Sequence, residues 1–271
     1  MTESATEVAR HFRRLHDSGL LILPNAWDAG SARMIESLGA RAIATSSAAV
    51  VWSHGYPDGD RLPVPLLVAT ALAIARVVRI PLSVDIEGGY SSDPAAVGEV
   101  VAQVVDAGTV GINLEDGTAP PDLLCAKIEA AKRSAARLGI DLFVNARSDV
   151  YLRGLVAADR RVSETLARAE RYRAAGADGL FVPGVSDATE IRAIATGQQL
   201  PLNVLAWGGL PAGPELASLG VRRLSAGSSI CQVVYGQIAS LATNFLATGT
   251  SAPLMERSLG YADLNALFAP R

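Results

Sequence analysis

Residues 81–117 read PLSVDIEGGYSSDPAAVGEVVAQVVDAGTVGINLEDG, and this stretch decides the fold. Two short apolar runs, over 81–86 and 111–115, flank a longer stretch with the apolar spacing of an amphipathic helix. Asp93 stands where a helix N-cap is expected, and Gly108 stands where the helix should end. A strand, a helix and a second strand in this order predict one unit of a parallel sheet.

The same unit recurs along the chain. Five glycines (Gly39, Gly108, Gly139, Gly176 and Gly220) each end a helical stretch and precede a strand, and Asp28 and Asp187 are further N-cap candidates. Eight strands are predicted by this pattern: Leu20 to Ala26, Ala42 to Ser46, Pro81 to Ile86, Gly111 to Glu115, Leu142 to Ala146, Gly179 to Val182, Leu202 to Ala206 and Arg223 to Ala226.

Eight uninterrupted units predict a closed (β/α)8 TIM barrel of the α/β class in one domain spanning residues 1–249. An open dinucleotide-binding sheet is disfavoured, because the glycine fingerprint with an acidic residue about 20 positions on is absent. We expect an extra helix over Glu3 to Ser18 and a long C-terminal helix over Ile230 to Thr248. Residues 250–271 form a tail with helical spacing between Leu254 and Phe268.

Composition limits the partners. The formal charge of −3 and the pI near 5.7 argue against a nucleic-acid partner, because no basic stripe could follow a phosphate backbone. The first residues lack the apolar region of a signal peptide, and no apolar run approaches the roughly 18 residues of a membrane span, so we expect no membrane partner and a cytoplasmic protein. Cys125 and Cys231 lack the spacing of a zinc or disulfide site and read as reduced packing residues.

The chemistry of a TIM barrel lies at the carboxyl ends of its strands, and here those ends are acidic. Alternation places Asp85 and Glu87 on one face after the third strand, and Glu115 ends the fourth. Because buried carboxylates are costly unless neutralised, a hard cation bound by oxygen ligands, Mg2+ or Mn2+, is predicted here. The alternative is a salt bridge to Arg147 or a solvated rim.

Arg147 ends the fifth strand with a guanidinium that can grip a carboxylate or phosphate through two parallel hydrogen bonds. A negatively charged substrate is therefore expected, a small carboxylic acid or a phosphate compound. The substrate-binding candidates are Ser46, Ser47, Ala48, Asp85, Arg147 and Asn203.

The residues that are missing restrict the reaction. The only lysines, Lys127 and Lys132, lie on the helix after the fourth strand, which disfavours a Schiff-base aldolase. Only one histidine, His54, lies in a candidate loop, which disfavours a zinc hydrolase.

Several motifs in order resemble the isocitrate lyase and phosphoenolpyruvate mutase (phosphonomutase) superfamily over about residues 10–245. The matching pieces are Pro24-Asn25-Ala26-Trp27-Asp28 with Ser31-Ala32-Arg33, Thr45-Ser46-Ser47, Val84 to Tyr90, Leu114-Glu115-Asp116 and Asn145 to Asp149. An Asp-x-Glu at a strand end is common, but the ordered set is fairly specific.

The resemblance implies roles for single residues. Asp85 would contact Mg2+ directly or through water, with Glu87 and Glu115 completing the shell, and Asp58 would face the reacting group as general base or steering group. Ser46, Ser47 and Ala48 would bind the substrate carboxylate, with Arg147 on the opposite side. It also implies a homo-oligomer, a tetramer or a dimer, with the helix Ile230 to Thr248 exchanged between subunits; packing on its own barrel remains the alternative.

The chain departs from the family in three places. Residues 117–122 read GTAPPD where the isocitrate lyases have a Lys-Lys-Cys-Gly-His loop, so this is a short form without that catalytic cysteine. The longer Lys-Thr-Asn gating loop of the phosphonomutases is missing. Pro183-Gly184 ends the sixth strand where those enzymes have a histidine.

These observations lead to three hypotheses. The first is a Mg2+-dependent enzyme acting beside a 2-keto or enolpyruvate carboxylate, as a carbon–carbon lyase or an oxaloacetate-type decarboxylase or hydrolase, with catalytic candidates Asp58, Arg147 and Glu115. The second is carbon–phosphorus chemistry of the phosphoenolpyruvate mutase type. The third is a non-catalytic barrel, or one that binds a phosphorylated ligand at Gly208-Gly209 and Ser225 to Ser229.

Overall fold

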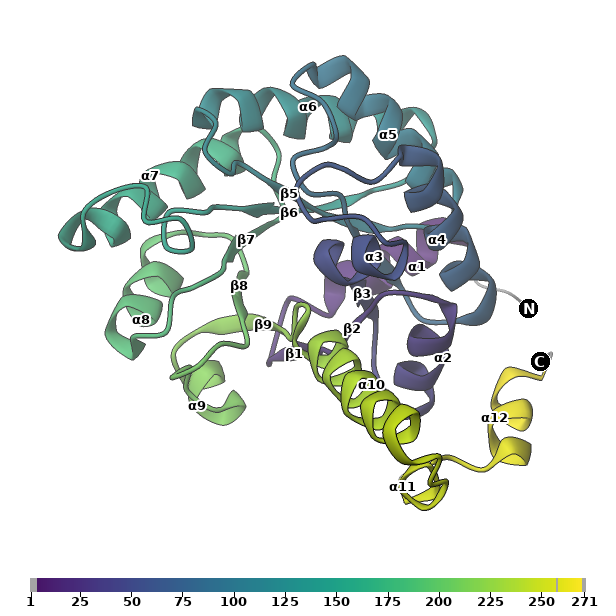
Figure 1. The fold of residues 1–271 in the computed structure, drawn as a ribbon. Helices are drawn as coiled ribbons and strands as arrows, with labels where there is room; N and C mark the ends of the chain where they lie inside the picture. The colour runs from purple at the N-terminus through teal and green to yellow at the C-terminus, as the bar shows by residue number, and fades with distance from the viewer. Residues whose placement is uncertain (1–3, 257, 270–271) are drawn as a thin grey trace.

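The computed structural model describes residues 4–256 and 258–269 and shows an α/β barrel (Figure 1). All strand pairs in its nine-stranded sheet are parallel, and helices surround the ring. The strands are β1 (Leu21–Leu23), β2 (Asn25–Ala26), β3 (Ile43–Thr45), β4 (Leu82–Asp85), β5 (Gly111–Glu115), β6 (Phe143–Arg147), β7 (Gly179–Val182), β8 (Leu202–Leu205) and β9 (Val221–Ser225).

The ring closes at its first strand. The predicted strand Leu20 to Ala26 is divided at Pro24, which has no N–H to donate to a sheet. Its first half, β1, pairs with β9, while its second half, β2, pairs with β3. The divided strand therefore accounts for nine strands in place of eight, and the predicted TIM barrel is confirmed.

The helices begin and end where the local signals predict. Asp28, Asp93 and Asp187 are the N-caps of three helices, each accepting a backbone N–H, and the five helix-ending glycines all have positive φ. The helices are α1 (Ala5–Arg14), α2 (Ala29–Ser37), α3 (Ser47–Ser53), α4 (Val64–Val77), α5 (Pro94–Asp106), α6 (Pro121–Arg137), the 3-10 turn η1 (Ala158–Arg160), α7 (Arg161–Ala174), α8 (Ala188–Gly197), α9 (Gly213–Ser218), α10 (Ser229–Thr248), α11 (Ala252–Met255) and α12 (Tyr261–Phe268).

The main apolar core fills the space between strands and helices, and a second cluster closes the end where the strands begin. There Phe12 of α1 is fully buried beside Phe143, with ring centroids 5.5 Å apart. A Cβ at Gly111 would lie 2.5 Å from the Phe12 ring, so this strand needs glycine where α1 seals the barrel. The other end of the ring is left for polar side chains.

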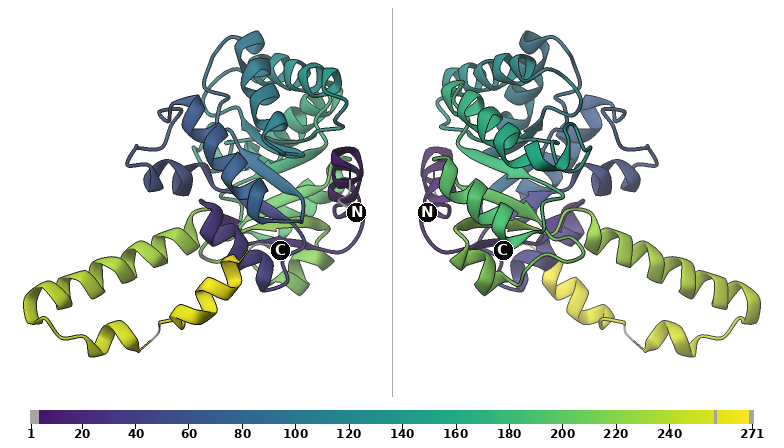
Figure 2. Two further views of the ribbon diagram at one scale, coloured as in Figure 1. Left: turned by 90° about the vertical axis from the view of Figure 1, so that its right-hand side faces the viewer. Right: turned by 90° about the vertical axis from the view of Figure 1, so that its left-hand side faces the viewer.

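Helix α10 projects from the barrel, and α11 and α12 bring the chain back towards α2 (Figure 2). Arg33 of α2 donates from Nε to the carbonyl of Leu267 at 3.1 Å. A groove of about 750 Å³ lies where α2, α10 and α12 meet, and none of the predicted site residues lines it. Helices in the tail agree with the spacing in residues 250–271, while the proposed division of the chain at residue 249 stays a prediction.

The expectation that no apolar stretch approaches the length of a membrane span needs correction at α10. The helix has 20 residues and is long and apolar enough, by length and composition, to cross a membrane. The interruptions by Gln232, Gln237 and Asn244 hide this in a search for an unbroken apolar run. Such a single helix is weak evidence for a membrane span. Apolar side chains of α10 are not covered by the barrel, since Val233 and Leu246 are 65% and 87% exposed. The predicted exchange of this helix between subunits and the cytoplasmic location stay predictions.

Candidate active site

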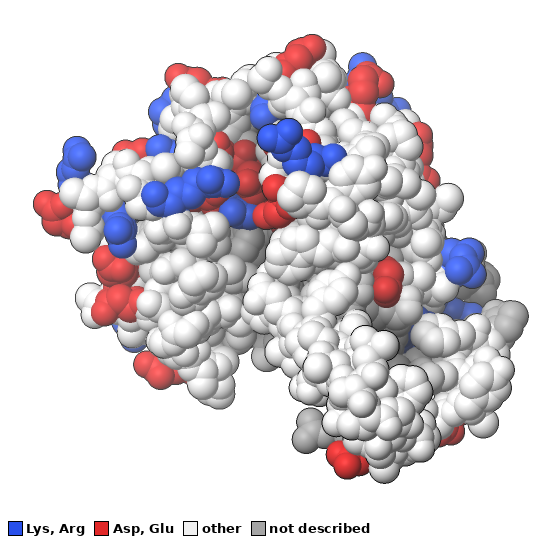
Figure 3. Space-filling model, viewed as in Figure 1, with Lys and Arg blue, Asp and Glu red and all other residues white. Residues whose placement is uncertain are grey.

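Three neighbouring strands end in the side chains that the sequence singled out. Asp85 is the last residue of β4, Glu115 of β5 and Arg147 of β6. The strands pair so that Glu115 lies directly beside Arg147, and Asp85 beside Asn113. Figure 3 shows acidic atoms in a hollow at this end of the barrel, with basic side chains around it, whereas the surface of α10 is almost uncharged.

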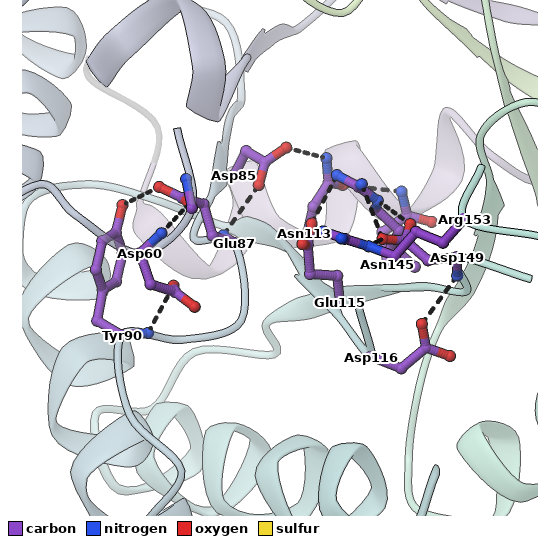
Figure 4. A network of polar contacts seen from close by, with 12 residues as sticks. Asp60, Asp85, Glu87, Tyr90, Asn113, Glu115, Asp116, Asn145, Asp149 and Arg153 are labelled. Carbon is purple, nitrogen blue, oxygen red and sulfur yellow. Dashed lines mark hydrogen bonds and ion pairs between the residues drawn. The ribbon is translucent and has the colours of Figure 1, made fainter. Parts of the chain in front are cut away.

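Asp85 is a buried carboxylate that accepts its hydrogen bonds from neutral groups. Its Oδ1 accepts from the backbone N–H of Glu87 at 3.0 Å, and its Oδ2 accepts from Asn113 Nδ2 at 3.3 Å (Figure 4). The residue is 7% exposed, and burial raises the pKa of its carboxyl group although Arg147 is close enough to oppose this. Its positive neighbours, Arg147 and Arg223, thus offset the cost of burial through their charge and not through a hydrogen bond.

Glu87 lies beyond the end of β4, so strand alternation no longer directs its side chain. Its Oε2 accepts from the backbone N–H groups of Gly59, at 2.8 Å, and of Asp60, and its Oε1 accepts from the hydroxyl of Tyr90 at 3.0 Å. In Figure 4 its carboxylate points to the side of Asp60 and Tyr90, whereas Asp85 points towards Asn113. Burial raises the pKa of Glu87 as well.

Glu115 and Arg147 form a short ion pair, with Oε2 and Nη1 2.6 Å apart. Burial nevertheless raises the pKa of Glu115 to about 8, against the effect of Arg147 and in the same direction as the negative charges of Asp85, Asp149 and Asp58. The carboxyl group of Glu115 is therefore protonated more readily than an exposed glutamate. That property suits a general acid.

Asp58 stands at the exposed rim between β3 and α4. Partial burial of its carboxyl group and the charge of Asp85 raise its pKa, and Arg147 lowers it. The charges that act on Asp58 are thus those of the strand-end residues, which brings it into the same site.

Two further carboxylates, Asp116 and Asp149, form a buried network that the sequence alone did not reveal. Asp149 accepts from Arg147 Nε at 2.7 Å and from Arg153 Nε at 2.8 Å. Asp116 accepts at its two oxygens from three donors: the N–H of Asp149 at 2.8 Å, Arg168 Nη1 at 2.7 Å and the Tyr172 hydroxyl at 2.6 Å. The spacing of Arg168 and Tyr172, one turn apart on α7, was the available signal.

The barrel interior below the site contains Asn113, Asn145 and Arg223, which the sequence reasoning also missed. Asn145 Nδ2 donates to Asn113 Oδ1 at 2.9 Å, and Arg223 Nη2 approaches the same oxygen at 3.4 Å. Burial lowers the pKa of Arg223 to about 10, opposed by the charge of Asp85. A cation within the barrel thus faces the acidic strand ends from below.

The predicted substrate-binding residues occupy two places. Ser46 caps α3, and Ser47 and Ala48 form its first turn, where backbone N–H groups remain outside the helix's own bonds. Asn203 is fully buried in β8, where it accepts from Ser225 at 3.1 Å. Gly227, in the alternative phosphate site, donates its N–H to Asn25 at 2.8 Å and is already bonded. The assignment of all these residues to substrate stays a prediction.

No three His, Cys, Asp or Glu side chains in residues 4–256 and 258–269 converge into a ready-made metal cluster. The predicted trio of Asp85, Glu87 and Glu115 is divided instead, because Glu87 turns towards Gly59 and Asp60 while Glu115 pairs with Arg147. A magnesium ion usually takes only one or two protein carboxylates and keeps several waters, so the arrangement still fits a site centred on Asp85.

Known proteins match this chain over nearly its whole length. An uncharacterized protein of Mycobacterium tuberculosis is 38% identical over 260 residues, covering 94% of this chain and 95% of its own. An oxaloacetate decarboxylase of Pseudomonas aeruginosa is 31% identical over 230 residues, or 80% of this chain and 77% of its own. A crystal structure of a Burkholderia cenocepacia protein assigned as a phosphonomutase has a TM-score of 0.84 and 38% identity, covering 89% of this chain and 99% of its own.

The family description that matches residues 12–246 is phosphoenolpyruvate phosphomutase. The match includes every strand of the barrel and all the strand-end residues described above. This chain therefore belongs to the phosphoenolpyruvate phosphomutase family.

Proposed function

We propose that the protein is a Mg2+-dependent carbon–carbon lyase that decarboxylates or hydrolyses a small 2-keto dicarboxylic acid of the oxaloacetate type. The observation that carries this proposal is the buried carboxylate of Asp85, whose hydrogen bonds come from neutral groups, close to the guanidinium of Arg147. The first suits a metal ion and the second a substrate carboxylate. The oxaloacetate decarboxylase of Pseudomonas aeruginosa, at 31% identity, supports this choice of reaction.

The residues fit a hard divalent ion because all their available ligands are oxygens. Burial raises the pKa of Asp85, and a bound cation would offset this cost for the carboxylate that contacts it. When bound, the ion would polarise the keto oxygen of the substrate and lower the cost of negative charge there.

The substrate would lie between two anion-binding groups. Arg147 bonds Asp149 through Nε and Nη2 and pairs with Glu115 through Nη1, so a substrate carboxylate would share Nη1 with Glu115. The first turn of α3, with Ser47 and Ala48, offers backbone N–H groups. A dicarboxylic keto acid has one carboxylate for each group. The match in charge and number supports a dicarboxylic substrate over a monocarboxylic one.

In decarboxylation the bond between C3 and C4 of the substrate breaks and carbon dioxide leaves. The electron pair of that bond stays on the pyruvate enolate, and a proton must then be added at C3. We assign this proton to Glu115, because burial raises its pKa to about 8 and so favours its protonated form. Asp58 is the candidate base for the hydrolytic form of the reaction. In that form a water molecule loses a proton and attacks the keto carbon C2, the bond between C2 and C3 breaks, and C3 takes up a proton, which gives oxalate and acetate.

Carbon–phosphorus chemistry is the second candidate, favoured by the 38% identity to the Burkholderia cenocepacia protein assigned as a phosphonomutase. The same two anion-binding groups could hold a phosphonate. Product analysis separates the two reactions. Oxaloacetate gives pyruvate and carbon dioxide by decarboxylation or oxalate and acetate by hydrolysis, whereas phosphonopyruvate gives phosphoenolpyruvate by rearrangement or pyruvate and phosphate by hydrolysis.

A thermal-unfolding titration with Mg2+ and oxalate tests the site before any substrate is known. Oxalate mimics an enolpyruvate, and a phosphonopyruvate hydrolase that shares this fold was crystallised with oxalate and Mg2+. A pair of ligands that binds only the folded state at 100 times its Kd adds about 2.7 kcal/mol to stability. We expect a rise that needs both ligands in the wild type and disappears in Asp85→Ala.

The matched control is Asp122→Ala, because Asp122 is an exposed aspartate of α6 whose side chain is 88% accessible. This variant should respond to the ligands as the wild type does. An absence of any response in the wild type would contradict the metal and enolate site and would favour a non-catalytic barrel. A response without turnover of either class of substrate would refute the lyase assignment alone.

A further inference from the structure

We propose that Glu87 is a positioning residue that fastens the loop carrying Asp58 to the turn after β4, and thereby fixes Asp58 at the barrel mouth. The contacts of Gly59, Asp60, Glu87 and Tyr90 that do this are called the Glu87 clasp. The consequence for catalysis rests on the role proposed for Asp58, whereas the clasp itself does not.

The clasp begins with one carboxylate oxygen that accepts from two consecutive backbone amides. Glu87 Oε2 accepts from the N–H of Gly59 at 2.8 Å and from the N–H of Asp60. Glu87 Oε1 accepts from the Tyr90 hydroxyl at 3.0 Å. Charged acceptors make stronger hydrogen bonds than neutral ones, so the two amides that follow Asp58 are held from within the site.

The loop of Asp58 also supplies an acceptor to the backbone of the turn after β4. Asp60 Oδ1 accepts from the backbone N–H of Tyr90 at 3.1 Å. A Cβ at Gly88 would lie 2.7 Å from Asp60 Oδ2, so the aspartate packs directly on the glycine backbone. Lys127 Nζ donates to the carbonyl of Gly88 at 2.6 Å and ties the turn to α6. The loop of Asp58 is thereby joined to the rigid part of the barrel.

Backbone geometry marks the same place. Asp60, Glu87 and Tyr90 have φ of 55°, 52° and 60°, and within residues 4–256 and 258–269 they are the non-glycine residues with positive φ. Such conformations are unfavourable for residues with a Cβ and persist where surrounding contacts enforce them, often at functional sites. All three belong to the Glu87 clasp.

The clasp determines where Asp58 lies because Gly59 follows it directly in the chain. Asp58 has no strand or helix of its own to hold it, since it lies between α3 and α4 in an exposed segment. Its carboxyl group nevertheless comes close enough to Asp85 and Arg147 for their charges to act on it. Without the hold on the next two amides, this placement would depend on a solvent-exposed loop alone.

Hydrogen exchange of residues 56–62, followed by mass spectrometry on the intact protein, tests the clasp directly. In Glu87→Ala the amides of Gly59 and Asp60 lose their acceptor, and we expect exchange in this segment to accelerate about tenfold or more. The matched control is Tyr90→Phe, which removes one bond to Glu87 and leaves both amide bonds in place. Hydrogen exchange of β4 and β5 should stay unchanged in both variants. This result would show that both variants fold.

Kinetics with oxaloacetate and Mg2+ separate positioning from a merely structural contribution. A displaced Asp58 should lower kcat in Glu87→Ala about tenfold while KM changes less than about threefold, because substrate still binds to Arg147. Unchanged exchange at residues 56–62 in Glu87→Ala would overturn the proposal, and so would faster exchange with kcat and KM as in the wild type. If the wild type lacks the proposed activity, the exchange result still decides the clasp.

Discussion

The two sides of the barrel mouth bury their carboxylates equally well but compensate them differently. After β4, Asp85 and Glu87 are 7% and 3% exposed and accept from backbone amides, an asparagine and a tyrosine. After β5 and β6, Asp116 and Asp149 are 4% and 0% exposed and are bonded to arginines at 2.7 to 2.8 Å.

The two kinds of buried carboxylate should therefore respond differently to mutation and to a bound cation. A buried carboxylate paired with arginine is neutralised, and its removal damages the fold. A buried carboxylate without a cation has a raised pKa and lowers stability until a positive ligand arrives. Glu115 and Arg147 end β5 and β6 and so belong to the second side, but the charge of Arg147 also acts on Asp85 of the first.

The largest effect is expected on the arginine side. Asp149→Asn removes the charge that Arg147 and Arg153 share, and breaking a buried pair in this way costs about 3 to 5 kcal/mol. Urea denaturation measures the loss. Asp122→Asn is the control, because its partner Arg171 and its own side chain are both exposed, and such pairs contribute about 1 kcal/mol or less. Equal losses in the two variants would contradict the comparison.

A pH-dependent effect of intermediate size is expected at Glu115. Its pKa is raised from 4.5 to about 8, so between these values the folded protein keeps a proton that the unfolded chain has released. Rising pH therefore favours unfolding in this window, and below it the effect vanishes because both forms are protonated.

Glu115→Gln cannot titrate and should lose less stability than the wild type as the pH rises from 4.5 to 8. Thermal denaturation in the presence of a chelator, at several pH values in this window, gives the difference. Parallel curves for the two proteins would show that the carboxyl group of Glu115 is not perturbed in the folded state.

The smallest effect is expected at Arg153, on the outer edge of the arginine side. Its side chain is 47% exposed, so its pair with Asp149 is screened by water. Arg153→Gln should cost about 1 kcal/mol or less in the urea measurement, because Arg147 still neutralises Asp149. A loss as large as that of Asp149→Asn would place Arg153 within the buried network.

The fold was predictable because its signals are local. An aspartate before a helix and a glycine after it act over a few residues, and apolar runs such as 111–115 and 179–182 coincide with β5 and β7. The rule that active sites lie at strand ends was enough to select Asp85, Glu115 and Arg147. Pro24 carried a signal that was overlooked, since a proline within a predicted strand indicates a break.

The remaining features depend on long-range geometry. The contact of Asp116 with Arg168 spans 52 residues and crosses from a strand end to a helix, and one sequence has no pattern for such a pair. Glu87 was placed beside Asp85 by strand alternation, but β4 ends at Asp85 and the left-handed backbone of Glu87 redirects its side chain. A periodicity rule cannot be extended past the end of the strand.

The break at Pro24 also sets the order in which the barrel can be completed. Residues 21–23 pair with residues 223–225, about 200 positions later, whereas residues 25–26 pair with residues 44–45. Contacts between distant segments form slowly because a long loop must close first. During synthesis residues 25–26 can pair with β3 early, whereas residues 21–23 cannot pair with β9 until residues 223–225 have been made.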